Sequence, residues 1–209
     1  MLDKFIPDLV SIDELRPWLT HPHEIGGFVY ISNGHICLKS PASNFSQKFE
    51  PVEGEKVPNF EGIREQAIPL ITPVKLHSYK IEECLSALPK HPKRQVCTTC
   101  LGCGEVECSE CGHEHECRDC KGAGGIGPVI GEWYGSYASI QLGKAIFGAN
   151  YIDLLLKIAE ALKQEIEVIR DSTNGVNIFK LSDTEVWIAP RTEKDMHHVS
   201  YEYRQLEAA

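Results

Sequence analysis

The chain has 209 residues, enough to bury a hydrophobic core in one domain with an insert or in two small domains. Hydrophobic residues make up 42% of it and charged residues 24%, which excludes a disordered or fibrous chain. The formal net charge of −9, from 30 acidic and 21 basic residues, is opposite to the basic excess typical of nucleic-acid-binding proteins.

The sequence predicts a cytoplasmic protein with no membrane partner. It contains no apolar run long enough to span a bilayer. The N-terminus MLDKFIPDLVSIDEL carries acidic residues where a secretory signal needs a basic start and an apolar stretch. Because thiols stay reduced in the cytoplasm, the nine cysteines indicate metal ligation rather than disulfides.

The first part of the chain predicts a short helix followed by a β-hairpin. In SIDELRPWL, Ser11 and Glu14 have the spacing of a capping box. The runs GFVYIS and HICLKS are joined by Asn33-Gly34, a pair that accepts the positive φ angles of a tight hairpin turn. We therefore expect two antiparallel strands here.

Residues 41–73 contain scattered Pro, Gly and Glu and predict a surface loop. A short element near 74–80 and a helix over IEECLSAL follow, and Pro89 ends that helix. The basic stretch LPKHPKRQV and the glycine-rich stretch KGAGGIGP then bracket a cysteine-rich segment. We predict that residues 1–90 form a first half and that 91–127 form an insert.

Residues 128–192 predict a second half with the order strand, helix, strand, strand, strand. SYASIQLGKAIF alternates as a strand does, and NYIDLLLKIAEAL has a helical apolar stripe with Asn150 as its cap. EIEVIRD, GVNIFKLSD and TEVWIAP predict three strands separated by turn residues. Residues 193–209 have no clear period, and we expect a tail that is an arm or a frayed end.

Seven of the nine cysteines lie between Cys97 and Cys120. A C-x-x-C turn brings two thiolates to one tetrahedral zinc ion, and glycines after it let backbone N–H groups reach the sulfurs. Two such turns have these glycines, at Cys97/Cys100 and at Cys117/Cys120. They predict one zinc site.

The remaining candidate ligands leave the number of ions open. A second site would use Cys108 and Cys111 with Cys103 and either His113 or His115. In the alternative pairing, 97/100 join 108/111, and 117/120 join Cys103 and a histidine. We therefore predict one or two Zn²⁺ ions held among Cys97, Cys100, Cys103, Cys108, Cys111, His113, His115, Cys117 and Cys120.

An iron–sulfur cluster and a catalytic zinc are the two alternatives to structural zinc. The spacing of Cys97, Cys100 and Cys103 is near that of a ferredoxin run, but the glycine-rich turns favour zinc over an iron–sulfur cluster. A catalytic zinc keeps a position open for water, whereas this segment has thiols enough to close its sites. Motifs of nucleotide binding or hydrolysis are missing from the sequence. We predict no catalytic residue and no enzyme activity.

The cysteine segment resembles the central zinc domain of the DnaJ family, whose unit is C-x-x-C-x-G-x-G. Two units match it fully, and the middle unit has His113 and His115 at the glycine positions. The family has four units where this chain has three, and the chain shows no J-domain motif. The resemblance covers about 28 of 209 residues and implies a zinc-knuckle fold, not co-chaperone activity. The matching residues are Cys97, Cys100, Gly102 and Gly104, then Cys117, Cys120, Gly122 and Gly124.

The flanking parts are similar to modules of the bacterial DNA polymerase sliding clamp, which are built from two copies of a strand, a helix and three strands. Residues 145–190 have this order, and Ser32-Asn33-Gly34-His35 is similar to a clamp hairpin turn. The resemblance implies an α+β fold of two such halves interrupted by the zinc-knuckle insert, as in small proteins of phage or prophage type.

These observations predict a non-enzymatic zinc-binding interaction protein of phage or mobile-element type. It would engage a protein partner in DNA metabolism or host defence. The alternative is a nucleic-acid-binding accessory factor that uses the zinc knuckle and the adjacent basic patch of Lys90, His91, Lys93 and Arg94. The identity of the partner and the oligomeric state are left open by the sequence.

Overall fold

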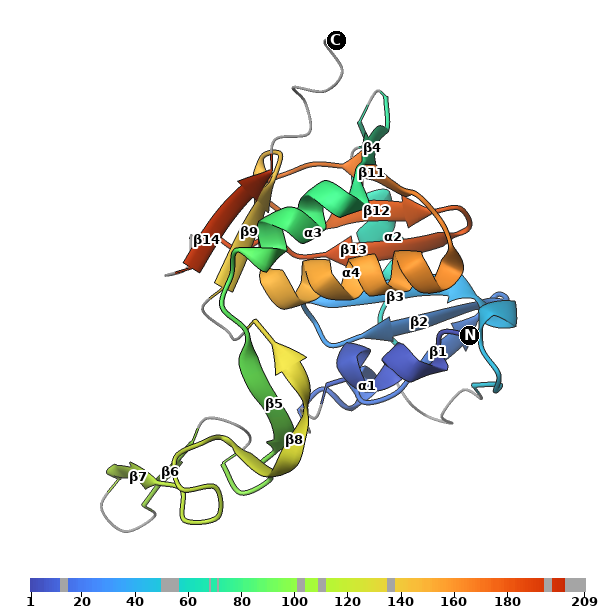
Figure 1. Cartoon of the computed structure of the whole chain (residues 1–209). Helices are drawn as coiled ribbons and strands as arrows, with labels where there is room; N and C mark the ends of the chain where they lie inside the picture. Colours follow the sequence, from blue (N-terminus) through green and yellow to red (C-terminus); the bar gives the residue numbers. More distant parts are fainter. Residues whose placement is uncertain are drawn as a thin grey trace. The chain divides into compact units, whose positions relative to one another are not determined.

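The computed structural model of the chain (Figure 1) describes residues 1–11, 15–49, 57–67, 69–70, 72–100, 104–108, 112–134, 138–193 and 197–201. The chain divides into two compact units, one formed by Met1–Leu88 with Ser136–Ala209 and the other by Pro89–Gly135. Most of the structure is antiparallel strand with few helices, so the predicted α+β class is confirmed.

A seven-stranded antiparallel sheet forms the framework of the first unit, in the order β1-β2-β3-β13-β12-β11-β4. The N-terminal and C-terminal parts of the chain meet where β3 pairs with β13, with Leu38 opposite Val186. The two parts therefore share one sheet. Its strands are β1 His23–Ile25, β2 Phe28–Ser32, β3 Ile36–Pro41, β4 Val74–Leu76, β11 Ile166–Arg170, β12 Asn177–Leu181 and β13 Thr184–Ile188.

A three-stranded sheet in the order β10-β9-β14 completes the strands of this unit. It consists of β9 Ala138–Leu142, β10 Ala145–Gly148 and β14 His197–Tyr201. The α-helices are α1 Ile6–Leu9, α2 Phe60–Glu65, α3 Ser78–Ser86 and α4 Ala149–Leu162, and 3₁₀ helices cover Asp3–Phe5, Pro17–Leu19 and Ala42–Asn44. None of the helices in the described part of the chain has the length and apolar character to cross a membrane.

Both faces of the large sheet are buried. Side chains alternate along each strand, so Leu38 and Val186 lie on one face and Cys37 and Trp187 on the other, all at most 8% exposed. Cys37 and Trp187 pack in one cluster with Phe60 of α2. Helix α4 crosses the opposite face (Figure 1), which makes this unit three layers thick.

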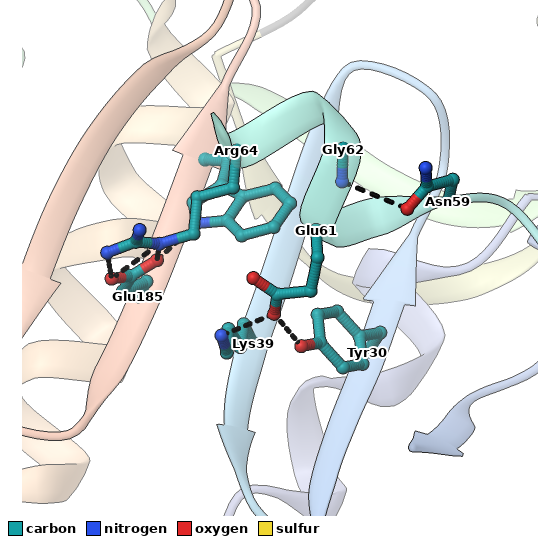
Figure 2. Close-up of polar contacts among 8 residues, drawn as sticks. Tyr30, Lys39, Asn59, Glu61, Gly62, Arg64 and Glu185 are labelled. Atoms are coloured by element: carbon teal, nitrogen blue, oxygen red, sulfur yellow. Dashed lines mark hydrogen bonds and ion pairs between the residues drawn. The ribbon is translucent and has the colours of Figure 1, made fainter. Parts of the chain in front are cut away.

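An ion pair fixes α2 on its face of the sheet (Figure 2). The Arg64 guanidinium donates to both carboxylate oxygens of Glu185 at 2.8 to 3.1 Å, and Trp187 Nε1 donates to the same carboxylate at 2.9 Å. Glu185 is only 8% exposed. Burial by itself raises the pKa of this carboxyl, but the hydrogen bonds from Arg64 and Trp187 outweigh it and hold the pKa below the ordinary value.

A second carboxylate of α2 binds the neighbouring strands β2 and β3. Lys39 Nζ donates to Glu61 Oε1 at 2.5 Å, and the Tyr30 hydroxyl donates to the same oxygen. The bond from Lys39, followed by that from Tyr30, lowers the pKa of Glu61. The Oδ1 of Asn59 accepts the Gly62 N–H at 2.9 Å and caps the start of the helix. Three strands are thus tied to one short helix.

Several predicted elements are confirmed, while the turn of the β2–β3 hairpin and the N-cap of α4 differ in detail from their predictions. The hairpin of β2 and β3, helices α3 and α4, and strands β11, β12 and β13 lie where the sequence predicts them. In the hairpin turn Gly34 has φ of 92°, while Asn33 accepts the His35 and Ile36 N–H groups at its Oδ1. Asn150 as the cap of α4 is wrong, because the cap position is Gly148 and no side chain bonds there.

Other elements differ from their predictions. In SIDELRPWL, residues 12–14 lie outside the described residues, and the 3₁₀ helix Pro17–Leu19 replaces the end of the predicted helix. The single strand predicted over 136–147 is a hairpin, because Gly143, with φ of 60°, reverses the chain between β9 and β10. The tail contains β14, which pairs in parallel with β9 and buries Tyr201.

The second unit contains two short antiparallel ladders. Strand β5 (His91–Val96) pairs with β8 (Gly125–Trp133), and β6 (Glu105–Glu107) pairs with β7 (Glu114–Glu116). We call the first ladder the ribbon. The two stretches interpreted as brackets of an insert are thus the strands of this ribbon. The division into 1–90, 91–127, 128–192 and 193–209 stays a prediction.

We expect Glu185→Gln to destabilise the first unit by roughly 1–3 kcal/mol at neutral pH, because the amide leaves the Arg64 guanidinium without its carboxylate. Since the folded pKa of Glu185 is lowered, the native stabilisation is present above the pKa of an unfolded glutamate and is lost as the pH falls through the folded pKa. Urea unfolding of both proteins at neutral and acidic pH measures this difference.

Glu165→Gln is the matched control, because Glu165 and Lys75 form a pair whose side chains are 74% and 63% exposed. Exposed pairs contribute little to stability, so this variant should unfold like the wild type. Equal destabilisation by the two substitutions would contradict the role given to the buried pair.

Candidate metal centre

Two C-x-x-C turns face each other at the centre of the second unit. The four Sγ atoms of Cys97, Cys100, Cys117 and Cys120 all lie within 4.8 Å of one another. This is the first of the two pairings that the sequence left open. The four side chains are at most 7% exposed, and among the described residues Val106 and Ile126 are packed against them as partly buried hydrophobic residues.

The sulfur geometry fits one tetrahedral metal ion. A zinc–sulfur bond of about 2.3 Å places the sulfurs of a regular tetrahedron about 3.8 Å apart. The Sγ atoms of Cys97 and Cys117 are 3.8 Å apart, and those of Cys100 and Cys120 are 3.6 Å apart. A disulfide needs about 2.05 Å. The four cysteines are therefore arranged as metal ligands and not as disulfide partners.

Each turn presents a backbone N–H group to its own second cysteine. Gly104 N–H donates to Cys100 Sγ, and Gly124 N–H donates to Cys120 Sγ, both at 3.3 Å. The two glycines have φ of 87° and 70°, in the region that side chains disfavour. Such bonds stabilise a thiolate, which is the form that ligates a metal.

The two turns are also bonded to each other in a reciprocal way. Cys97 N–H donates to Gly124 O at 2.9 Å, and Cys117 N–H donates to Gly104 O at 2.7 Å. Each cysteine of the first turn has its equivalent in the second turn twenty positions later in the chain. The two full repeats of the sequence thus form two equivalent halves of one site.

The four thiols influence the pKa of one another. Burial is the main cause that raises the pKa of Cys120 to about 12; the Gly124 N–H acts against it, and the bonds with the three other thiols add to it. A metal ion has to displace these protons when it binds. The donor set, its tetrahedral spacing and the N–H bonds to sulfur all fit zinc.

The described candidate ligands of the middle unit, Cys108, His113 and His115, do not belong to this cluster. Cys103 and Cys111 lie outside the described residues, while Cys108 is half-buried and His113 and His115 are exposed. His115 pairs with Val106 in the β6–β7 ladder. Among the described residues, the metal-binding group contains the four cysteines of the two full turns. A second ion bound by the middle unit stays a prediction.

The two cysteines outside the segment belong to the first unit. Cys37 is buried in the cluster beneath α2, and Cys84 is half-buried with its Sγ 3.7 Å from Ser200 O. Burial raises the pKa of both thiols. Neither thiol belongs to the metal-binding group found among the described residues.

The predicted basic patch lies on the ribbon. Lys90 Nζ is 5.1 Å from the centre of the Tyr134 ring, and His91, Lys93 and Arg94 line a groove together with Trp133. Trp133 is 41% exposed, and no sequence pattern predicts it as a surface residue. Its spacing from the patch, about forty residues along the chain, gives no local pattern, and only the pairing of His91 with Trp133 brings it there.

A comparison with known protein families finds none that matches this chain, and a comparison with curated proteins finds no match either. The likenesses to the DnaJ zinc domain and to the sliding clamp therefore stay predictions. The chemistry of the site has to be argued from its own residues.

We expect Gly104→Ala to weaken metal binding at least tenfold. A Cβ at this position would lie 2.3 Å from Gly122 O, and the backbone has a positive φ, so the turn that directs N–H to sulfur would have to move. Cobalt(II) titration, followed by its thiolate absorption bands and by competition with zinc, measures the affinity.

Gly131→Ala provides the control, because its Cβ would meet nothing within 4 Å and its φ is ordinary. This variant should bind the metal like the wild type. Unchanged cobalt affinity in Gly104→Ala would show that the N–H bond to sulfur is not needed.

Proposed function

We propose that this chain is a non-enzymatic zinc-binding interaction protein. The observation that carries the proposal is the closed tetrahedron formed by Cys97, Cys100, Cys117 and Cys120. Four thiolates fill every position of tetrahedral zinc, whereas a catalytic zinc keeps one position for water. The ion would therefore hold the fold of the second unit.

The same geometry supports zinc over an iron–sulfur cluster. A cluster places inorganic sulfide and several irons between the cysteines, which separates their sulfurs more widely than one ion does. Here all four Sγ atoms lie within 4.8 Å of one another, and two of the pairs are 3.6 and 3.8 Å apart, close to the edge of a tetrahedron around a single ion. Elemental analysis and an absorption spectrum of the purified protein test this directly. Visible charge-transfer bands would replace zinc by iron.

The second unit also has a surface suited to a protein partner. Val96, Val129, Ile130 and Trp133 of the ribbon are 41% to 63% exposed. Exposed apolar side chains that gather on one element are typical of interaction sites. We propose that the partner belongs to DNA metabolism or host defence, as the resemblance to phage-type clamp proteins implies.

Nucleic acid is the alternative partner, supported by the basic side chains beside Trp133. The net charge of −9 opposes it. Binding to a polyanion releases counterions, so its affinity would fall steeply with salt. Salt titration with a single-stranded oligonucleotide therefore separates the alternatives. Undetectable binding at physiological salt would exclude the accessory-factor proposal.

We expect Cys97→Ser to lose zinc and to unfold the second unit while the first unit keeps its structure, because the four thiols form the buried cysteine cluster of the second unit. Hydrogen exchange of the full chain measures both effects. Amides of β5 and β8 should exchange fast, and those of β12 and β13 should stay protected.

Cys84→Ser changes a cysteine outside the cluster and serves as the control, with zinc content and protection like the wild type. Loss of protection throughout the chain in Cys97→Ser would show that the metal is integral to both units. Full zinc content in that variant would contradict the assigned ligands.

A further inference from the structure

The ribbon carries a groove of about 600 Å³ that the metal site does not use. Its volume is within the range of sites that take a small ligand or part of a peptide. The described residues that line it belong to the unit Pro89–Gly135. The lining residues are His91, Pro92, Lys93, Arg94, Val96, Ala123, Gly124, Gly125 and Trp133.

The charges of this unit are segregated. The described residues that line the groove include two permanent cations, Lys93 and Arg94, and no carboxylate. The β6–β7 ladder instead places Glu105 opposite Glu116 and Glu107 opposite Glu114. The chain has 30 acidic and 21 basic residues, so the positive charge of the groove is opposite in sign to the net charge of the chain. The groove is thus complementary to an anionic group.

The groove also has an apolar side. Trp133 is 41% exposed and Val96 is 47% exposed, and both belong to its lining. Val129 and Ile130 of β8 are also exposed, at 51% and 63%. An occupant that fits needs an apolar side chain next to its negative charge, because indole and aliphatic surfaces gain by leaving water.

We propose that the groove binds a short acidic peptide segment of a protein partner, with one aromatic or aliphatic residue seated on Trp133 and Val96 and a carboxylate beside Lys93. This proposal deepens the proposed interaction function and rests on it. The binding surface is then the ribbon, and the peptide is recognised by its negative charge and by its apolar side chain.

The charges favour a peptide over a nucleic-acid strand. A strand carries a phosphate at every nucleotide and needs a long basic track, whereas the groove offers two permanent cations. The same unit holds four glutamates on β6 and β7, which would repel a polyanion that extends beyond the groove. The aliphatic side chain of Val96 in the groove suits a peptide side chain better than a base.

The metal site supports one wall of the groove. Gly124 lies in the lining, donates its N–H to Cys120 Sγ and accepts the Cys97 N–H at its carbonyl. Gly125 then continues into β8 opposite Val96. Zinc therefore orders the backbone against which the peptide would lie, and removal of zinc should abolish binding.

The test uses the full, zinc-loaded chain and fluorescein-labelled short peptides, read out by fluorescence anisotropy. One peptide alternates Asp or Glu with Phe or Leu, a second replaces the acidic residues by Lys, and an oligothymidylate of similar length is the third probe. Lys93→Glu and Trp133→Ala are the groove variants. Lys48→Glu and Tyr79→Ala are the controls, because Lys48 and Tyr79 are exposed residues of the first unit.

We expect the acidic peptide to bind the wild type and both controls, with at least tenfold weaker binding to each groove variant and none after chelation of zinc. No binding of the acidic peptide, equal binding of the basic peptide, or preferred binding of the oligothymidylate would overturn the assignment. Zinc content and hydrogen exchange on the same samples show whether each variant is folded.

The outcomes also separate the groove from the proposed function. A partner captured equally by the wild type and by Lys93→Glu with Trp133→Ala, but not by Cys97→Ser, would refute the groove and leave the zinc-dependent interaction intact. A chain that holds no zinc would refute the proposed function itself.

Discussion

The second unit depends on the convergence of four thiols in a segment with almost no apolar side chains. Among the described residues, its buried cluster contains four cysteines with Val106 and Ile126 packed against it, a small apolar contribution beside the entropy of ordering the segment. A structural zinc contributes on the order of 10 kcal/mol to such a fold. The reciprocal bonds between Cys97 and Gly124 and between Cys117 and Gly104 then make both turns one cooperative structure.

The first unit is stabilised differently, by a sheet that is covered on both faces. Pairing of β3 with β13 joins parts of the chain that are about 150 residues apart in sequence. The short helix α2 places Arg64 on the second face. There its guanidinium donates hydrogen bonds to the carboxylate of Glu185 in β13. This face is thus closed by an ion pair between buried Glu185 and partly exposed Arg64, placed over an apolar cluster, a combination that needs good geometry to be favourable.

Local patterns predicted local structure well. The period of NYIDLLLKIAEAL and the alternation in EIEVIRD, GVNIFKLSD and TEVWIAP correspond to α4, β11, β12 and β13, because each element buries one face and its period follows from backbone geometry. Patterns failed where pairing decided the structure. HHVSY becomes a strand because β9 offers it an edge, and Gly143 divides a run that alternates throughout.

The sequence by itself determined the metal chemistry, since two C-x-x-C-x-G-x-G repeats specify thiolate pairs and the glycines that direct N–H groups to them. Only the tertiary structure decided that 97/100 share a site with 117/120, because several pairings satisfy the same spacing. The groove beside Trp133 is likewise a product of the β5–β8 pairing. Spacing along a chain constrains neighbours within a turn, whereas contacts across tens of residues depend on which strands find each other.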